Sequence, residues 1–289
     1  MVPAKTWLAI PILAIACAAL AAAAGQPLHA AIAIGALAAA TAAAVRAFAG
    51  PSLAAAATAG AAALLVTFGV LELDTLDTTR GTLAAAAALF AIAELARPLP
   101  VDASPLPALG AALVAGVLDP GHVALLAIAG VRLLRGPWAR PRWAPIVPVL
   151  GTLAIGIAGL AACAQEGLFA ELWHVWAARA GTEAPLALLV EIGDLLGPIA
   201  TLAAIAGLAV CATRGRYAAA ATVTVAVGAL GVDLACGVLG AGTLAIAAVG
   251  AGVGLARMAA IVRWPTGQAF VGATAGFLIV VAPAMLRLY

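Results

Sequence analysis

Apolar runs long enough to cross a lipid bilayer recur along the whole chain, and they constrain its fold more than any other feature. A transmembrane helix needs about 20 mostly apolar residues. Because lipid offers no hydrogen-bond partners to the backbone, runs of this length indicate helices. Apolar residues make up 66% of the 289 residues and charged residues only 9%, against roughly 25% charged in soluble domains. The sequence therefore predicts an all-α, polytopic integral membrane helical bundle, with residues 1–289 in a single transmembrane domain and no soluble domain.

Glycine, proline and charged residues divide these runs into about 9–11 transmembrane helices. Residues 106–134 hold two short apolar runs on either side of Asp119-Pro120-Gly121-His122. Each gives only roughly 20 Å of helix, so we expect either two thin spans or one re-entrant helical hairpin. Residues 168–180 alternate apolar and polar faces, which is typical of an interfacial helix on the outer surface. The other predicted spans cover residues 7–24, 28–48, 52–71, 82–96, 144–164, 185–213, 217–239, 243–262 and 267–286.

The distribution of lysine and arginine predicts how the chain is oriented. If the amino terminus is cytoplasmic and the spans alternate, only Arg80, Arg179 and Arg287 of the 14 basic residues fall outside. The alanine-rich composition fits a bacterial genome rich in GC, so we expect a multi-pass protein of a bacterial inner membrane. One basic loop is predicted to be a cytoplasmic anchor that attracts anionic lipid. Its arginines are Arg132, Arg135, Arg140 and Arg142.

Carboxylates inside predicted spans are the first candidate functional residues. Glu191 and Asp194 are three apart within the run from residue 185 to residue 213, and they share one face if that run is an unbroken helix. Asp233 lies in the next span, at a similar predicted depth. Ionisable groups in hydrocarbon are costly and mark ion and substrate pathways, so these three acids predict a proton, ion or substrate site. The structural alternative is that each acid is neutral and hydrogen-bonded to Thr201, Thr222 or Thr224, or to a backbone carbonyl.

A glycine and a proline interrupt the run that holds two of these acids. Gly197-Pro198 is predicted to loosen the helix there, as in the interrupted helices of transporters. Paired glycines four residues apart are predicted to bring helices into close contact. The pairs are Gly193 with Gly197, Gly250 with Gly254, and Gly272 with Gly276.

Polar residues on the predicted outer face form a second candidate site. Its members are Asp74, Asp77, Asp119, His122, Glu171 and His174. Asp119 and Glu171 each precede a histidine by three residues, a spacing used in di-metal helical bundles. However, Pro120 and Gly121 make the first pair part of a turn. We therefore predict no metal and no cofactor. These residues are interpreted as a solvated outer surface, or as part of the active site if the protein is an enzyme.

Three hypotheses about function follow. The first is a membrane transport protein that moves a small solute or ion, coupled to protonation of Glu191, Asp194 and Asp233. The second is a non-catalytic membrane subunit, with protein partners inside the membrane. The third is an extracytoplasmic-face enzyme acting on a lipid-linked substrate, as glycosyltransferases with many spans do. Whether the chain is an enzyme is therefore left open. The lipid bilayer is the one partner that all three share, and none of them involves nucleic acid.

Overall fold

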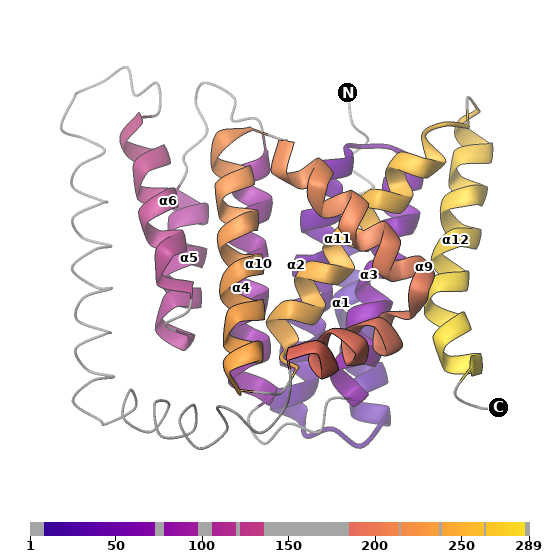
Figure 1. Ribbon diagram of the computed structural model, residues 1–289, viewed down its shortest axis with the longest axis horizontal. Coiled ribbons are helices and arrows are strands. Elements are labelled where there is room, and N and C mark those ends of the chain that lie inside the picture. The colour runs from indigo at the N-terminus through magenta and orange to yellow at the C-terminus, as the bar shows by residue number, and fades with distance from the viewer. Residues whose placement is uncertain are drawn as a thin grey trace.

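The computed structural model describes residues 9–72, 78–97, 106–119, 122–135, 185–213, 215–236, 239–262 and 264–286. Every regular element within these ranges is a helix (Figure 1). This confirms the predicted helical bundle. The helices are α1 (Ala9–Ala23), α2 (Leu28–Ala49), α3 (Leu53–Glu72), α4 (Thr78–Ala96), α5 (Leu106–Leu118), α6 (Val123–Arg135), α9 (Pro185–Thr213), α10 (Arg216–Cys236), α11 (Ala241–Ala259) and α12 (Pro265–Leu286).

Neighbouring helices along the chain run in opposite directions through the bundle, except α6 and α9, which flank residues 136–184 and run in the same direction (Figure 1). Helices α2, α4, α6, α9 and α11 all end at the side where the amino terminus lies. Helix α11 is the centre of the described fold, because it contacts α2, α3, α4, α9, α10 and α12. Its residues from Thr243 to Ala256 are all buried. The bundle is therefore built around an alanine- and glycine-rich helix.

Small residues explain how α9 comes so close to α11. A Cβ atom added to Gly250 would lie 2.6 Å from the carbonyl oxygen of Ala204 in α9. One added to Gly207 of α9 would collide with the carbonyl oxygen of Gly250, and one added to Gly254 would collide with that of Ala203. Without a hydrophobic drive between helices in lipid, such close backbone approach supplies the packing energy. The predicted Gly250–Gly254 face is therefore confirmed.

The other two predicted glycine pairs had different outcomes. A Cβ on Gly276 would lie 2.5 Å from the Cβ of Ala61, and one on Gly272 would lie 3.4 Å from the Cα of Ala54, so this pair packs α12 against α3. The prediction for Gly193 and Gly197 was wrong. Among the described residues, no atom lies within 4 Å of a Cβ placed on Gly193, and Gly197 interrupts the helix instead.

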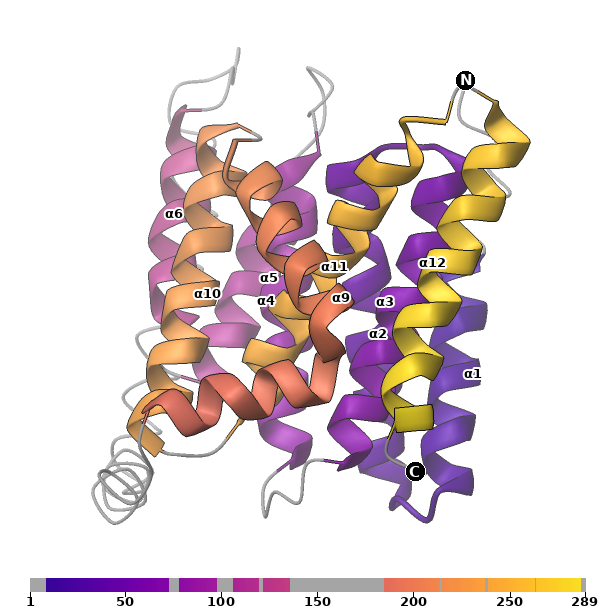
Figure 2. The ribbon, with the colours of Figure 1, turned by 45° about the vertical axis from the view of Figure 1, so that its right-hand side comes forward.

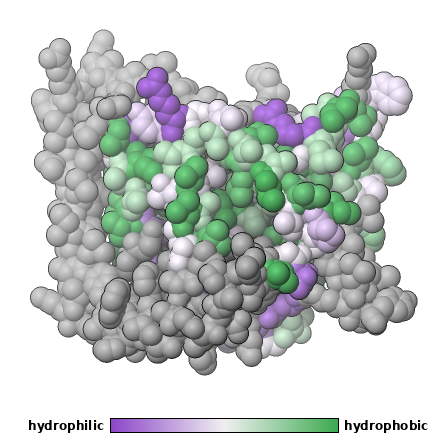
Figure 3. Space-filling view, in the orientation of Figure 1, coloured by the Kyte–Doolittle hydropathy of each residue, from purple (hydrophilic) through white to green (hydrophobic). Residues whose placement is uncertain are grey.

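Five of the described helices are long and apolar enough to cross a membrane. Large hydrophobic side chains also lie on the outside of the bundle, among them Ile205 on α9, Val227 on α10 and Phe270 on α12. Figure 3 shows hydrophobic side chains over the middle of one face and hydrophilic ones towards its upper edge. This arrangement suits a surface that faces lipid. The five candidate spans are Leu28–Ala49, Leu53–Glu72, Thr79–Ala96, Gly193–Thr213 and Ala241–Ala259.

The hairpin of α5 and α6 is joined to both ends of α4. At one end, Nε of Arg80 in α4 donates to the carbonyl oxygen of Leu118 over 2.7 Å. At the other, Arg132 of α6 donates to the carbonyl oxygens of Leu95 and Arg97. The hairpin thus reaches along the full length of a candidate membrane span. This geometry favours two thin spans over a hairpin that turns back within the membrane. The predicted span 144–164 and interfacial helix 168–180 lie outside the described residues.

Candidate functional site

Helix α9 is broken where the sequence predicts weakness. Gly197 has φ 74° and ψ 161°, a conformation that only glycine adopts without strain, and Pro198 cannot donate the next helical hydrogen bond. Figure 2 shows the first half of α9 lying across the lower ends of its neighbours, while the second half runs up beside α11. The acids at positions 191 and 194 belong to the transverse half.

This break changes the expected placement of the first two acids. The depth that an unbroken, upright helix would give them does not hold, because their half of α9 turns across the bundle. The side chain of Asp194 is exposed on the bundle. Glu191 lies in the same half-helix, and its side chain falls outside the described part of the structure. The half-helix that carries both residues therefore lies across the lower ends of neighbouring helices (Figure 2).

Asp233 is the buried acid of the described bundle, with 7% of its surface exposed. One oxygen of its carboxylate, Oδ2, accepts a hydrogen bond of 2.9 Å from the backbone N–H of Gly240. Gly240 is the N-cap residue of α11, so the acid of one helix caps the start of the next. The partial positive charge of a helix N-terminus stabilises a carboxylate in this position. The hydroxyl of buried Thr243, in the first turn of α11, lies beside it.

One residue from the predicted outer-face set, Asp119, lies near Asp233, and a second, His122, lies in the same turn as Asp119. Asp119 is close enough for its charge to act on the Asp233 carboxylate. His122, only 3% exposed, follows in the same turn, and its backbone N–H donates to the carbonyl oxygen of Asp119 over 3.0 Å. Arg80 reaches this turn through its bond to Leu118. We call Arg80, Asp119, His122, Asp233 and Thr243 the Asp233 cluster.

The Asp233 cluster joins two sites that the sequence treats as separate. Its residues come from the start of α4, the turn between α5 and α6, the end of α10 and the start of α11. Helix α10 packs against α4, α6 and α11. Sequence reasoning named three of its members and missed the roles of Arg80 and Thr243. No sequence signal reveals them, since their importance comes from neighbours far away in the chain.

Two of the threonines proposed as partners of the buried acids have other partners. The hydroxyl of Thr201 donates to the carbonyl oxygen of Gly197 over 2.9 Å, and that of Thr222 donates to Ala218 over 2.8 Å. Both bonds lie within one helix, a common solution for hydroxyls on apolar helices. The structure therefore shows both hydroxyls donating within their own helices and not to an acid.

The predicted basic anchor is described in part. Arg132 bonds to the end of α4, as described above, and its guanidinium lies 5.9 Å from the ring centroid of Tyr217. It therefore joins α4, α6 and α10, and it provides the cation that a helix C-terminus favours. The backbone of Arg135 lies in the last turn of α6, and Arg140 and Arg142 lie outside the described residues.

The remaining outer-face residues, Asp74, Asp77, Glu171 and His174, also lie outside the described part of the chain. Among the described residues, no group of three or more histidine, cysteine, aspartate or glutamate side chains is arranged to hold a metal ion. Comparison of the chain with known protein families, with characterised proteins and with solved structures found no match. The geometry of α9 and of the Asp233 cluster is therefore what bears on function.

Proposed function

We propose that this chain is a multi-pass transport protein that moves a small solute or ion across the membrane, coupled to protonation of its carboxylates. The observation that carries the proposal is the break in α9 at Gly197-Pro198, directly after the half-helix that bears Glu191 and Asp194. Transporters bind substrates and coupling ions at helices interrupted in this way, because the break exposes backbone groups beside charged side chains.

The Asp233 cluster supports the same proposal. The charges of Asp119 and Asp233 act on each other at one end of an otherwise apolar bundle, and the turn that carries Asp119 also holds the buried His122 and is bonded to Arg80. Chains of acids and histidines are the usual proton relays of membrane proteins. Because His122 is buried, a relay within the protein fits this cluster better than a surface open to a lipid-linked substrate.

The location that goes with this proposal is a bacterial inner membrane with the amino terminus in the cytoplasm. The helix ends support it: Arg46, Arg97, Arg132 and Arg257 all lie at or near the carboxyl ends of helices that finish on the side of the amino terminus. Glu72, Asp119 and Asp233 lie towards the opposite side. This separation of charge is the pattern that sets membrane orientation.

The test is proton movement by the purified protein in proteoliposomes under an imposed pH gradient. We expect the wild type to move protons, and the double variant Glu191→Gln/Asp194→Asn to lose most of that movement while keeping its helical content. Glu72→Gln is the matched control, because Glu72 is an exposed acid at the same end of the bundle. Unchanged flux in the double variant would remove these two acids from the site.

The same preparation separates the alternatives. A wild type that is folded but moves no protons would favour a transported solute without proton coupling, or an outer-face enzyme. A subunit of a larger complex should instead be unstable when purified alone, because helix faces meant for partners would be left without them. Thermal stability of the purified wild type is therefore recorded alongside the flux.

A further inference from the structure

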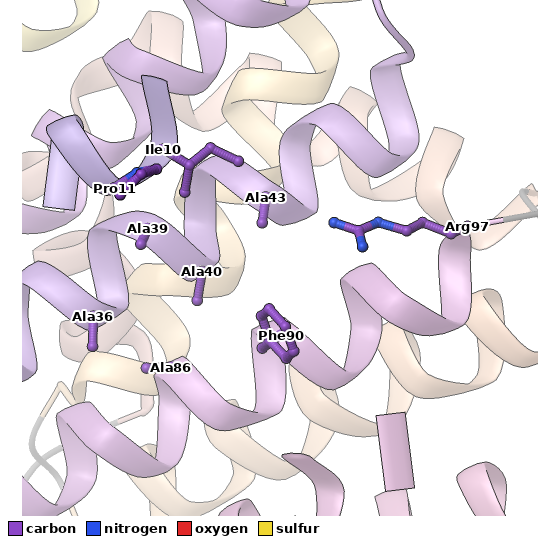
Figure 4. A pocket seen from close by; sticks show the side chains of 9 residues that line it. All are labelled: Ile10, Pro11, Ala36, Ala39, Ala40, Ala43, Ala86, Phe90 and Arg97. Carbon is purple, nitrogen blue, oxygen red and sulfur yellow. The ribbon is translucent and has the colours of Figure 1, made fainter. Parts of the chain in front are cut away.

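An apolar pocket opens between α1, α2 and α4, away from the Asp233 cluster (Figure 4). Its volume is about 530 Å³, within the range of pockets that hold small molecules. Four alanines of α2 form its floor, namely Ala36, Ala39, Ala40 and Ala43. They recur at helical spacing, so one face of α2 is hollowed along two turns. The ring of Phe90 on α4 lines one wall.

Among the described residues that line this pocket, one is charged, Arg97. The guanidinium of Arg97 points back over one end of it, towards Ala43 (Figure 4). Arg97 forms an ion pair with Glu94. Arg46, which is 7% exposed, lies close enough to feel the charge of Arg97. Arg132 is bonded to the same end of α4.

Counted over the described residues, these four charged residues give an excess of positive charge at the end of the pocket that Arg97 lines. They comprise three guanidinium groups and one carboxylate, and Arg46 among them is buried from water. The carboxyl ends of α2 and α4 offset part of this excess through their helix dipoles. Like charges held together in such a place favour an anion beside them, since Coulomb interactions strengthen as water is removed.

We propose that this pocket binds an anionic phospholipid, with one acyl chain along the alanine floor and the phosphate at Arg97. An acyl chain suits the apolar lining, and burying its methylene groups is favourable. A free phosphate would leave that lining unused, and a zwitterionic lipid would not neutralise the excess charge. The predicted cytoplasmic side is also where anionic lipids attract basic residues. The proposal is independent of transport.

The experiment uses the full chain in phosphatidylcholine vesicles that contain a trace of a photoreactive lipid. The probe is phosphatidylglycerol with a diazirine in its acyl chain, and phosphatidylcholine with the same acyl chain is the comparison. Cross-linked peptides are mapped by mass spectrometry. We expect the anionic probe to label the pocket peptides of α2 and α4 about fivefold more than the zwitterionic probe, the factor that one basic side chain contributes to anionic lipid attraction.

Matched variants separate a built pocket from general surface charge. Arg97→Gln should remove the preference for the anionic probe, and Arg97→Lys, which keeps the charge, should retain most of it. Ala39→Phe fills the pocket and should lower labelling by both probes. The controls are Arg257→Gln, an exposed arginine at the same side of the bundle, and Ala209→Phe on the exposed face of α9.

Three results would overturn the proposal. One is equal labelling of the wild-type pocket by the two probes. Another is an equal loss of the preference in Arg257→Gln and Arg97→Gln, which would mean attraction to the surface as a whole. The third is unchanged labelling in Ala39→Phe. The wild-type comparison and the Arg97→Lys variant keep the test decisive even if Arg97→Gln fails to fold.

Discussion

Asp233 near the end of α10 accepts a hydrogen bond of 2.9 Å from the backbone N–H of Gly240, the residue at which α11 begins. The two positions are so close that a Cβ on Gly240 would lie 2.6 Å from the other carboxylate oxygen of Asp233. The acid thus fixes the connection into the helix at the centre of the bundle. This structural role stands beside any role in proton movement, and the two are separable by experiment.

Removal of the Asp233 carboxylate should destabilise the protein. We expect Asp233→Ala to lower the stability by about 1 kcal/mol, the usual net contribution of one hydrogen bond. Asp233→Asn should lower the stability less, because its amide oxygen can still accept the hydrogen bond from Gly240. The measurement is thermal unfolding of the purified protein in detergent. Asp194→Ala is the control and should unfold near the wild-type temperature, because its side chain is exposed. Equal stability of Asp233→Ala and the wild type would contradict the capping role.

The break in α9 should depend on Gly197 more than on Pro198. At φ 74° and ψ 161°, a side chain at position 197 would be strained by roughly 1–3 kcal/mol, so Gly197→Ala should either destabilise the protein or straighten α9. Pro198→Ala restores only a hydrogen-bond donor and should preserve the break. Thermal unfolding and proton flux in proteoliposomes are measured for both variants. If Gly197→Ala retains both stability and flux, the broken helix is not needed.

Helix ends were predictable from the sequence because turns and charges mark them. The span expected at 28–48 is observed as Leu28–Ala49, and the one expected at 243–262 as Ala241–Ala259. The weakness at Gly197-Pro198 was predictable for the same reason, since both residues act locally on the backbone. The direction in which the first half of α9 turns was not, because it is set by the helices on which that half lies.

Which helix lies at the centre was also beyond the sequence. In a soluble protein, a polar stripe distinguishes the outer face of a helix, but lipid-facing and protein-facing surfaces in a membrane are both apolar. Nothing in the residues of α11 therefore marks it as more central than α12. The approach of Asp119 to Asp233 was hidden for a similar reason, since it joins elements that the sequence separates widely.

Close packing of α9 on α11 should make Gly207 intolerant of any side chain. A methyl group there would collide with the carbonyl oxygen of Gly250, so we expect Gly207→Ala to destabilise the protein by about 1–3 kcal/mol, as overpacking does. Gly60→Ala in α3 is the control, because no atom of the described part of the chain lies within 4 Å of the new Cβ. It should be neutral or mildly stabilising, since alanine is the better helix former. Similar thermal unfolding of the two variants would show that the contact is looser than described.

Labelling of single cysteines should reveal both the orientation and the path of the α5–α6 hairpin. The four native cysteines are first replaced by alanine, and intact cells are then treated with a membrane-impermeant maleimide. We expect labelling of Gln26→Cys and Asp119→Cys, which lie in turns at the predicted outer side. Ser52→Cys, between α2 and α3, should be labelled only after permeabilisation, because the helices place it at the opposite end. Labelling of Ser52→Cys alone would reverse the orientation. Labelling of Gln26→Cys without Asp119→Cys would mean that the hairpin turns back inside the membrane, despite the contacts of Arg80 and Arg132 at the two ends of α4.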